Sequence, residues 1–367
     1  MTTERFLLKD FFNPETIGII AEAVAGAYPD FNAGSFVIAV FDDQWDGREL
    51  KQRMRQASEC LRAALPDDYE EALAILVEAG PNTAEAGFAA MVMSDFVEAH
   101  GIDYFKASVD ALAVFTRTIS AEFAVRPFLV RYPEAMLARM LDWADGPDPA
   151  LRRLASEGSR PRLPWGMALK QYQADPAPII PLLAKLRHDP SEDVRRSVAN
   201  NLNDIAKDHP DLVVEVLGSW QDGSDEVADI TRHALRVLIK QGHAGALELL
   251  GFHPDPDIVV EQLTVEPSPA TIGSKVAVSF TVRSTGATTQ PIVVDGVVHF
   301  ARQTGTSKKV FKWKTAELAP GASVPIRRSV TLQHLSTRRI YAGTHAVEVQ
   351  VNGAVKAAAQ FEVEADG

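Results

Sequence analysis

Cysteine is almost absent from this chain of 367 residues, in which Cys60 is the only one. A single cysteine excludes an intramolecular disulfide and any metal site built from several cysteines. The 9 histidines show no HExxH spacing, and the chain has neither a GxxxxGKS/T nor a GxGxxG pattern. Metal, nucleotide and dinucleotide cofactors are therefore not expected.

Long apolar runs are also missing. The longest, from Gly87 to Met93, is too short to cross a bilayer. The first residues mix charges of both signs with aromatics, and they lack an apolar core followed by a small-residue cleavage site. We therefore expect no membrane partner and a cytoplasmic location.

The composition is that of a globular protein, with 46% hydrophobic and 23% charged residues. The chain is longer than one core usually requires, so two domains are expected. From Pro14 to about Leu250 apolar residues recur at helical spacing. The proline-rich stretch from His253 to Pro256 disfavours further helix, which predicts domains at 1–253 and 254–367.

The helical part repeats itself weakly. An apolar residue precedes arginine in Leu151–Arg153, Val194–Arg196 and Ile230–Arg232, which lie about 40 residues apart. This spacing favours HEAT-like helical pairs stacked into an α solenoid. Helical packing without true repeats is the alternative.

After the linker, short β-branched runs alternate with turn residues. About seven such runs in just over one hundred residues predict an all-β, immunoglobulin-like sandwich.

The formal net charge is −12, but the charge is unevenly distributed along the chain. The part after Pro254 is slightly basic, and the part before it is acidic. Between Arg302 and Arg339 the single acidic residue is Glu317. The basic residues there are Arg302, Lys308, Lys309, Lys312, Lys314, Arg327, Arg328, Arg338 and Arg339. They predict a face that contacts phosphates. A solvated strand edge that lysines protect against aggregation is an equally good interpretation.

Glu122 stands in an apolar, helix-forming context beside Phe123 and Pro127. A partly desolvated carboxylate there requires a cation or an ordered water. An ion pair with Arg126, four residues later, would explain both residues without a function.

Glu157 lies among four arginines, Arg152, Arg153, Arg160 and Arg162, which indicates a charged ligand or partner. Trp165 follows in a proline-glycine turn, where an indole is often presented for stacking or cation contacts, although it could also fill the core.

Asp204 and Asn200 are one helical turn apart and could line a groove together. Exposure to solvent is the plain alternative.

Four segments together resemble the AlkC family of DNA alkylation-repair glycosylases, within the AlkC/AlkD superfamily of HEAT-like repeat proteins. They are Leu7–Asn13, Ser120–Phe128, Glu157–Gly166 and Asp193–Asp211. The C-terminal part resembles the Ig-like domain that one subgroup of this family carries.

The resemblance implies hydrolysis of the N-glycosidic bond of cationic alkylated bases, 3-methyladenine and 3-methylcytosine, in duplex DNA. It also implies that the lesion is reached without conventional base flipping. The family's active-site carboxylates correspond to Glu122, Glu157 and Asp204, and its aromatic neighbour corresponds to Trp165.

Carboxylates suit this chemistry, because cleavage builds positive charge on the sugar. We expect a monomer in which other basic residues anchor the DNA: Arg152, Arg153, Arg160, Arg162, Lys308, Lys309, Lys312, Lys314, Arg338 and Arg339. The competing interpretations are a noncatalytic HEAT-repeat scaffold and a lesion-binding protein without catalysis.

Overall fold

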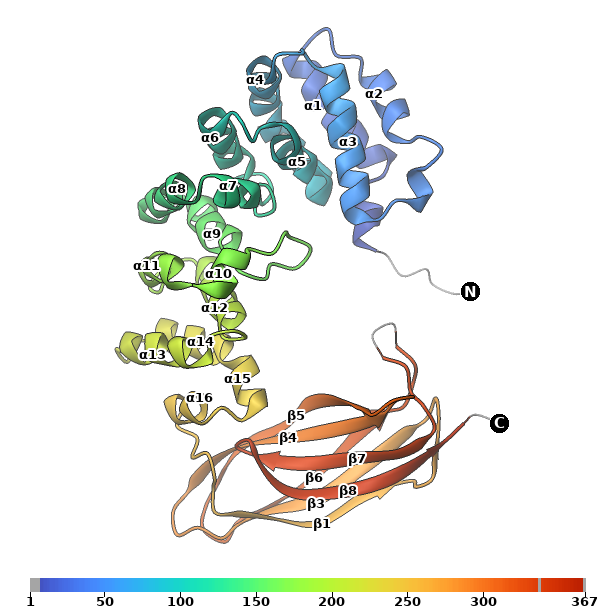
Figure 1. Cartoon of the computed structure of the whole chain (residues 1–367), viewed down its shortest axis with the longest axis vertical. Coiled ribbons are helices and arrows are strands. Elements are labelled where there is room, and N and C mark those ends of the chain that lie inside the picture. Colours follow the sequence, from blue (N-terminus) through green and yellow to red (C-terminus); the bar gives the residue numbers. More distant parts are fainter. Residues whose placement is uncertain (1–6, 336–337, 366–367) are drawn as a thin grey trace. The chain divides into compact units, whose positions relative to one another are not determined.

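The structure is a computed structural model that describes residues 7–335 and 338–365 (Figure 1). Contacts between residues divide the chain into two compact units. One unit contains Met1–Asp208 and Asp225–Ile230, and the other contains His209–Ser224 and Thr231–Gly367. The predicted boundary at residues 253 and 254 falls between the last helix and the first strand.

Helices make up the whole of the described chain before residue 258 apart from turns and loops. The α-helices are α1 (Pro14–Ala27), α2 (Ala33–Val40), α3 (Leu50–Ala64), α4 (Tyr69–Ala79), α5 (Met91–His100), α6 (Phe105–Phe115), α7 (Val125–Arg131), α8 (Pro133–Asp145), α9 (Pro149–Gly158), α10 (Lys170–Ala174), α11 (Ile180–Lys185), α12 (Glu192–Ile205), α13 (Pro210–Trp220), α14 (Asp225–Ala234), α15 (Arg236–Gln241) and α16 (Ala244–Leu249). The described chain also has four 3₁₀ helices: η1 (Leu8–Phe11) precedes α1, and η2 (Trp45–Gly47), η3 (Gly80–Ala90) and η4 (Ala177–Ile179) lie between α-helices.

Capping side chains fix the starts of two helices. Asn13 caps α1 by accepting hydrogen bonds from the backbone NH groups of Glu15 and Thr16, and a proline occupies the first helical position. Asp148 caps α9 in the same way through Ala150. Both arrangements satisfy NH groups that a helix start leaves without a partner.

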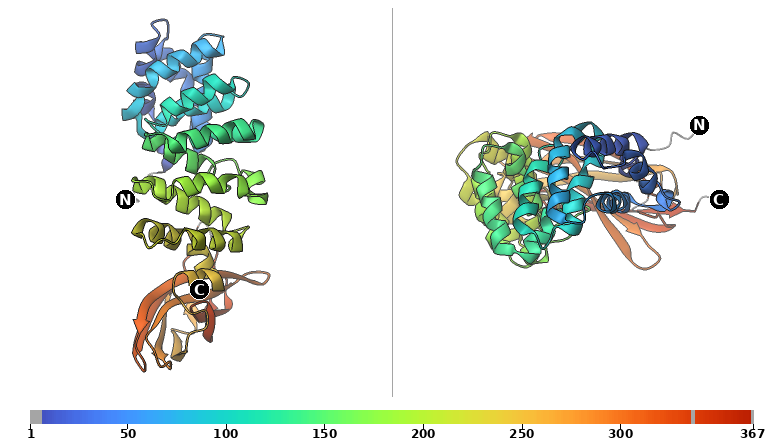
Figure 2. Two further views of the ribbon diagram at one scale, coloured as in Figure 1. Left: turned by 90° about the vertical axis from the view of Figure 1, so that its left-hand side faces the viewer. Right: turned by 90° about the horizontal axis from the view of Figure 1, so that it is seen from above.

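The helices stack in successive layers, as Figure 2 shows for α6 to α12. Helix α9 packs against α8 on one side and against α12 on the other. The predicted repeat segments fall on α9, α12 and α14. The HEAT-like solenoid is therefore confirmed. Its consequence for the site is that residues about 40 positions apart face each other across neighbouring layers.

Strands form the C-terminal domain: β1 (Ile258–Glu266), β2 (Ala270–Thr271), β3 (Lys275–Ser284), β4 (Gln290–Ala301), β5 (Thr306–Leu318), β6 (Ser323–Thr331), β7 (Gly343–Val351) and β8 (Ala354–Glu364). One sheet has the order β1-β3-β6 and the other β2-β8-β7-β4-β5. Their inner faces enclose one core that includes Phe280, Val298, Phe300 and Trp313. This is the predicted immunoglobulin-like sandwich.

None of the helices in the described part of the chain is both long and apolar enough to span a membrane.

Candidate active site

Glu157 and Asp204 come together because α9 packs against α12. Each lies in the last turn of its helix, and the buried guanidinium of Arg160 joins them. Its Nη1 donates to Glu157 Oε1 at 2.6 Å, and its Nε donates to Asp204 Oδ2 at 2.9 Å. Burial alone would lower the pKa of Arg160, but the two carboxylates raise it above the ordinary value. Arg160 therefore stays charged and balances them.

The remaining oxygens of this pair are also hydrogen-bonded. Ser197 donates to Glu157 Oε2 at 2.6 Å, and Lys207 donates to Asp204 Oδ1 at 2.8 Å. Asn201, on the same face of α12, donates to the backbone oxygen of Ser156 at 2.9 Å. The side-chain exposure is only 8% for Glu157 and 3% for Asp204. Both carboxylates are thus held rigidly.

The polar face of α12 differs from the prediction by one residue. The side of α12 that meets α9 carries Ser197, Asn201 and Asp204. Asn200 is half-buried, whereas Asn201 is fully buried. Asp204 is only 2% exposed, so simple exposure to solvent does not explain it.

Glu122 belongs to a second, more open network. It lies in the turn before α7, not within the helix as its apolar context suggested. Its Oε2 accepts a hydrogen bond from Ser120 at 2.5 Å and two from the guanidinium of Arg153 at 3.2 Å each. Its side chain keeps 16% exposure. Glu122 therefore has more access to solvent than the other two carboxylates.

Arg126 does not pair with Glu122 as the ion-pair interpretation required. Its fully buried guanidinium donates to the backbone oxygens of Gly158, Arg160 and Met167. The pKa of Arg126 is lowered to about 10, chiefly by burial and also by the charge of Arg160, while the charges of Asp204, Glu122 and Glu157 oppose that change. All three carboxylates thus act electrostatically on one buried arginine.

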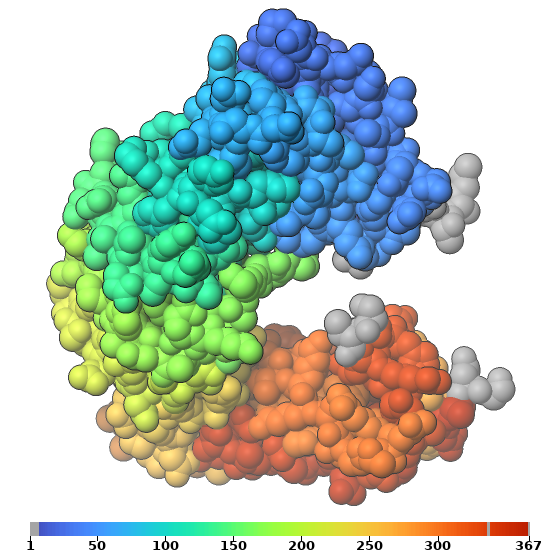
Figure 3. Space-filling view, turned by 45° about the horizontal axis from the view of Figure 1, so that its top comes forward, coloured from blue at the N-terminus to red at the C-terminus, as the bar shows by residue number. Residues whose placement is uncertain are grey.

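Trp165 does not fill the core. It is 61% exposed and lies in the loop from 159 to 169, between α9 and α10. Its φ angle of 59° is in the left-handed region, which is uncommon for a residue other than glycine. The loop extends away from the helices in Figure 1, and its light green surface protrudes from the helical unit in Figure 3. The indole is therefore available to a ligand.

The four arginines around Glu157 all have carboxylate partners. Arg153 binds Glu122, and Arg160 binds Glu157 and Asp204. The other two bind carboxylates outside the predicted set: Arg152 holds the buried Asp189, and the more exposed Arg162 holds Asp208. Two of the four arginines thus belong to the carboxylate cluster itself.

The basic residues predicted to contact DNA in the Ig-like domain lie on one edge strand and around one hollow. Lys308, Lys309, Lys312 and Lys314 lie on β5, which is an edge strand of its sheet. Arg338 and Arg339 help line a hollow of about 420 Å³. Its other lining residues are Arg302, Gln303, Thr304, Ser307, Leu335 and Tyr341, none of them acidic. This geometry is compatible with either phosphate contact or protection of the edge.

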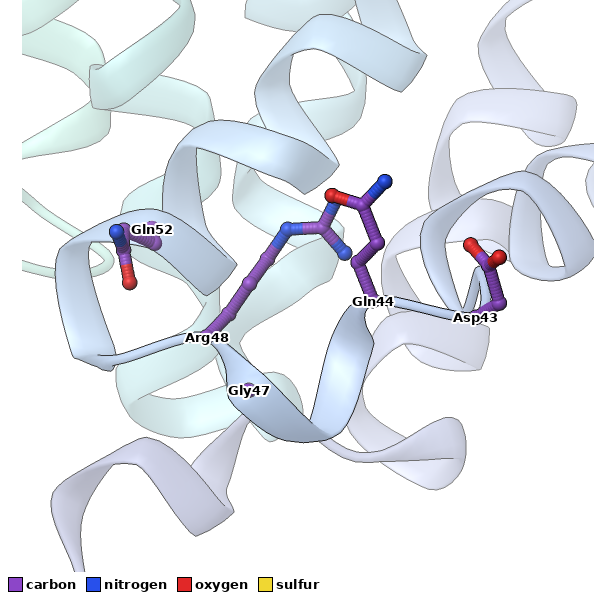
Figure 4. A pocket seen from close by; sticks show the side chains of 5 residues that line it. All are labelled: Asp43, Gln44, Gly47, Arg48 and Gln52. Carbon is purple, nitrogen blue, oxygen red and sulfur yellow. The ribbon is translucent and has the colours of Figure 1, made fainter.

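A separate hollow of about 510 Å³ lies near η2 and contains none of the predicted site residues. Figure 4 shows Arg48 and Gln44 extending toward one another there, with Asp43 and Gln52 on either side. Arg48 forms an ion pair with Asp42. We assign the candidate active site to the carboxylate cluster instead, because that is where buried charges converge.

Within residues 7–335 and 338–365, no group of three or more His, Cys, Asp or Glu side chains could hold a metal ion.

Sequence reasoning did not identify Ser120, Ser197, Lys207 or the role of Arg126. Spacing could have indicated Ser197, because residues 197, 201 and 204 recur at helical intervals. Arg126 gave no such signal, because its partners are backbone oxygens more than thirty positions away.

Comparison with known proteins agrees with this architecture. A family model described as the C-terminal Ig-like domain of uncharacterised protein YhaZ matches residues 259–365, and a HEAT repeat model matches residues 179–209. Uncharacterized protein YhaZ of Bacillus subtilis (strain 168) is 37% identical over 97% of this chain and 99% of its own length. A solved structure, Pseudomonas fluorescens alkylpurine DNA glycosylase AlkC bound to DNA containing an abasic site analog, is 40% identical. That match has a TM-score of 0.93 and covers 98% of this chain and 100% of the other.

Proposed function

Because this chain belongs to the AlkC family, we propose that it is a DNA glycosylase that hydrolyses the N-glycosidic bond of cationic alkylated bases in duplex DNA. Its substrates in this proposal are 3-methyladenine and 3-methylcytosine, reached without conventional base flipping. The chain acts as a monomer and needs no cofactor. The observation that carries the proposal is the full-length similarity to an alkylpurine DNA glycosylase bound to DNA, combined with the three clustered carboxylates.

The chemistry starts from a base that is already positively charged. The glycosidic bond breaks with its electron pair going to the departing base, which leaves as a neutral molecule. The sugar is left with oxocarbenium character, and water adds to C1′ and loses a proton. No acid is needed to protonate the leaving group, so the protein's task is to stabilise the sugar cation.

We assign the position next to the sugar to Glu122. It is the most exposed of the three carboxylates, and Ser120 and Arg153 fix its orientation. It can therefore orient the water and accept its proton. Glu157 and Asp204 are deeper and locked by Arg160, so they contribute a fixed negative potential.

Trp165 is the proposed contact to the damaged base. An exposed indole attracts a cationic base more than a neutral one, by about 1 to 2 kcal/mol. This preference favours alkylated over normal bases without a pocket that encloses the base.

The test replaces each carboxylate by its amide, in Glu122→Gln, Glu157→Gln and Asp204→Asn. Single-turnover release of 3-methyladenine should fall by about 10²-fold or more in each, because each change removes negative charge near the sugar cation. Binding to DNA that contains an abasic site analog should change little. Asp43→Asn, in the hollow of Figure 4, is the matched control and should keep the wild-type rate.

Wild-type rates in all three variants would refute the assignment. If the unmodified protein releases no base but binds the lesion, it is a lesion-binding protein. If it neither releases base nor prefers damaged DNA, a noncatalytic HEAT-repeat scaffold is the better description.

A further inference from the structure

Arg126 is a fully buried arginine whose three described hydrogen-bond acceptors are all backbone oxygens. Its Nη1 donates to Gly158 at 2.9 Å and its Nη2 to Arg160 at 2.8 Å, while its Nε donates to Met167. These acceptors span the end of α9 and the loop from 159 to 169, which we call the Trp165 loop. One side chain of α7 thus fixes both ends of that loop.

Two leucines anchor the Trp165 loop in the protein interior, and its tryptophan is exposed to solvent. Leu163 and Leu169 are buried at 5% and 0% exposure, and Leu169 NH donates to Pro161 at 3.1 Å. Trp165, between them in sequence, is 61% exposed and keeps a left-handed backbone. That conformation costs on the order of 1 kcal/mol or more and persists only where the surroundings impose it. Burial of the indole does not offset this cost.

Two glycines allow the loop to approach α7 closely. A Cβ at Gly166 would lie 3.3 Å from Arg126 Nε and 3.0 Å from Leu163 Cδ2. A Cβ at Gly158 would lie 2.5 Å from Val125 Cγ2. Side chains at these positions would push the backbone oxygens away from the guanidinium.

We propose that Arg126 is a positioning residue that holds the Trp165 loop in the conformation that presents the indole to the damaged base. This inference rests on the proposed function. The planar guanidinium directs several donors at fixed angles, which a lysine cannot reproduce. With a pKa of about 10, lowered by burial, Arg126 remains protonated at neutral pH. It therefore keeps all its donors under working conditions.

Tryptophan labelled with fluorine gives a direct view of the loop. The other four tryptophans, Trp45, Trp143, Trp220 and Trp313, are all buried. The ¹⁹F resonance that disappears in Trp165→Phe identifies the loop residue. In Arg126→Lys this resonance should shift or split while the four others stay in place. Gly166→Ala should do the same without removing a hydrogen-bonding group, which keeps the test valid if Arg126→Lys fails to fold.

Release of 3-methyladenine is the second readout. Both variants should be slower by about 10- to 100-fold, because small displacements of a positioned group are costly. Their affinity for undamaged DNA should stay within about twofold, because neither change removes a phosphate contact. Arg53→Lys is the matched control, since Arg53 is also buried and donates to the backbone oxygens of Arg48 and Lys9. It should leave the Trp165 resonance and the release rate unchanged.

An active wild-type protein whose Trp165 resonance and release rate survive both substitutions would overturn the positioning role and leave the proposed function intact. Loss of release without any change at Trp165 would also overturn it. A wild-type protein that releases no base would instead refute the proposed function, whatever the spectra show.

Discussion

At the scale of single residues, each carboxylate of the cluster is held by a cation in a confined space. Arg160 compensates two buried carboxylates, and Arg153 compensates the more open Glu122. Removing one member would leave another charge buried without a partner, which is more costly than the pair is stabilising. The cluster is therefore expected to be rigid before DNA binds, as electrostatic stabilisation of a cation requires.

The sequence predicted the functional residues of the site but not their hydrogen-bond partners. The positions of Glu122, Glu157, Trp165 and Asp204 followed from the family resemblance, and in the structure Arg160 joins Glu157 to Asp204 while Arg153 holds Glu122. Their partners could not be predicted in the same way. The pairing of Glu122 with Arg126 assumed one continuous helix, whereas Glu122 lies in a turn and meets Arg153 from α9.

A buried carboxyl in the Ig-like domain leads to a prediction about pH. Asp295 on β4 is 2% exposed, and within the described chain its Oδ1 has no hydrogen-bond partner. Burial raises the pKa of Asp295 to about 6, although Lys312 and Lys240 lower it in part. The ordinary value is 3.8, so the folded state binds this proton more tightly than the unfolded state. Stability is therefore lost as the pH rises from about 4 to about 6, and above about pH 6 the ionised carboxylate destabilises the fold by its full amount, roughly 3 kcal/mol at most.

Asp295→Asn should remove this penalty. The variant should be more stable than the wild type at pH 8, and the difference should shrink as the pH falls from about 6 to 4. Thermal unfolding of both proteins across this range measures it. Asp255→Asn is a control of opposite sign, because Lys356 lowers the pKa of that exposed carboxyl. A difference between Asp295→Asn and the wild type that does not vary with pH would contradict the account.

At the scale of elements, the packing of neighbouring helices brings site residues together, and the spacing of residues along one helix does not predict these contacts. The contact of α9 with α12 brings Glu157 to Ser197 and brings Asp204 to Arg160, which also binds Glu157, so the site is a product of the repeat architecture. The sequence predicted the solenoid and the longer strands because their apolar periods are clear. It missed β2, which has two residues, and the 3₁₀ helices, because segments this short have no period to detect.

The lysines of β5 support two interpretations that one experiment can separate. Changing Lys308, Lys309, Lys312 and Lys314 together to glutamine should weaken DNA binding and reduce the salt slope, by about 0.9 for each phosphate that the variant no longer neutralises. Binding measured at several salt concentrations gives this slope. The double variant Lys275→Gln with Lys356→Gln, on β3 and β8, is the control and should change the slope less.

Protection of the edge predicts a different outcome. If the lysines serve only to keep β5 from pairing with other chains, the fourfold variant will keep the wild-type slope. It will instead associate with itself in sedimentation experiments. That result would remove β5 from the DNA-binding surface.

At the scale of the whole molecule, a HEAT-like solenoid and an Ig-like sandwich occur in one chain that is similar over its full length to a DNA glycosylase. Architecture alone does not specify an activity, because helical repeats also serve as scaffolds. The proposed activity therefore rests on specific residues, the carboxylates paired with Arg160 and Arg153 and the exposed Trp165.

The most direct measurement is chromatographic identification of the bases released when the purified chain is incubated with duplex DNA containing 3-methyladenine. We predict that free 3-methyladenine accumulates and that one abasic site forms for each base released. DNA that keeps all its methylated bases under conditions where the chain binds it would contradict the central claim.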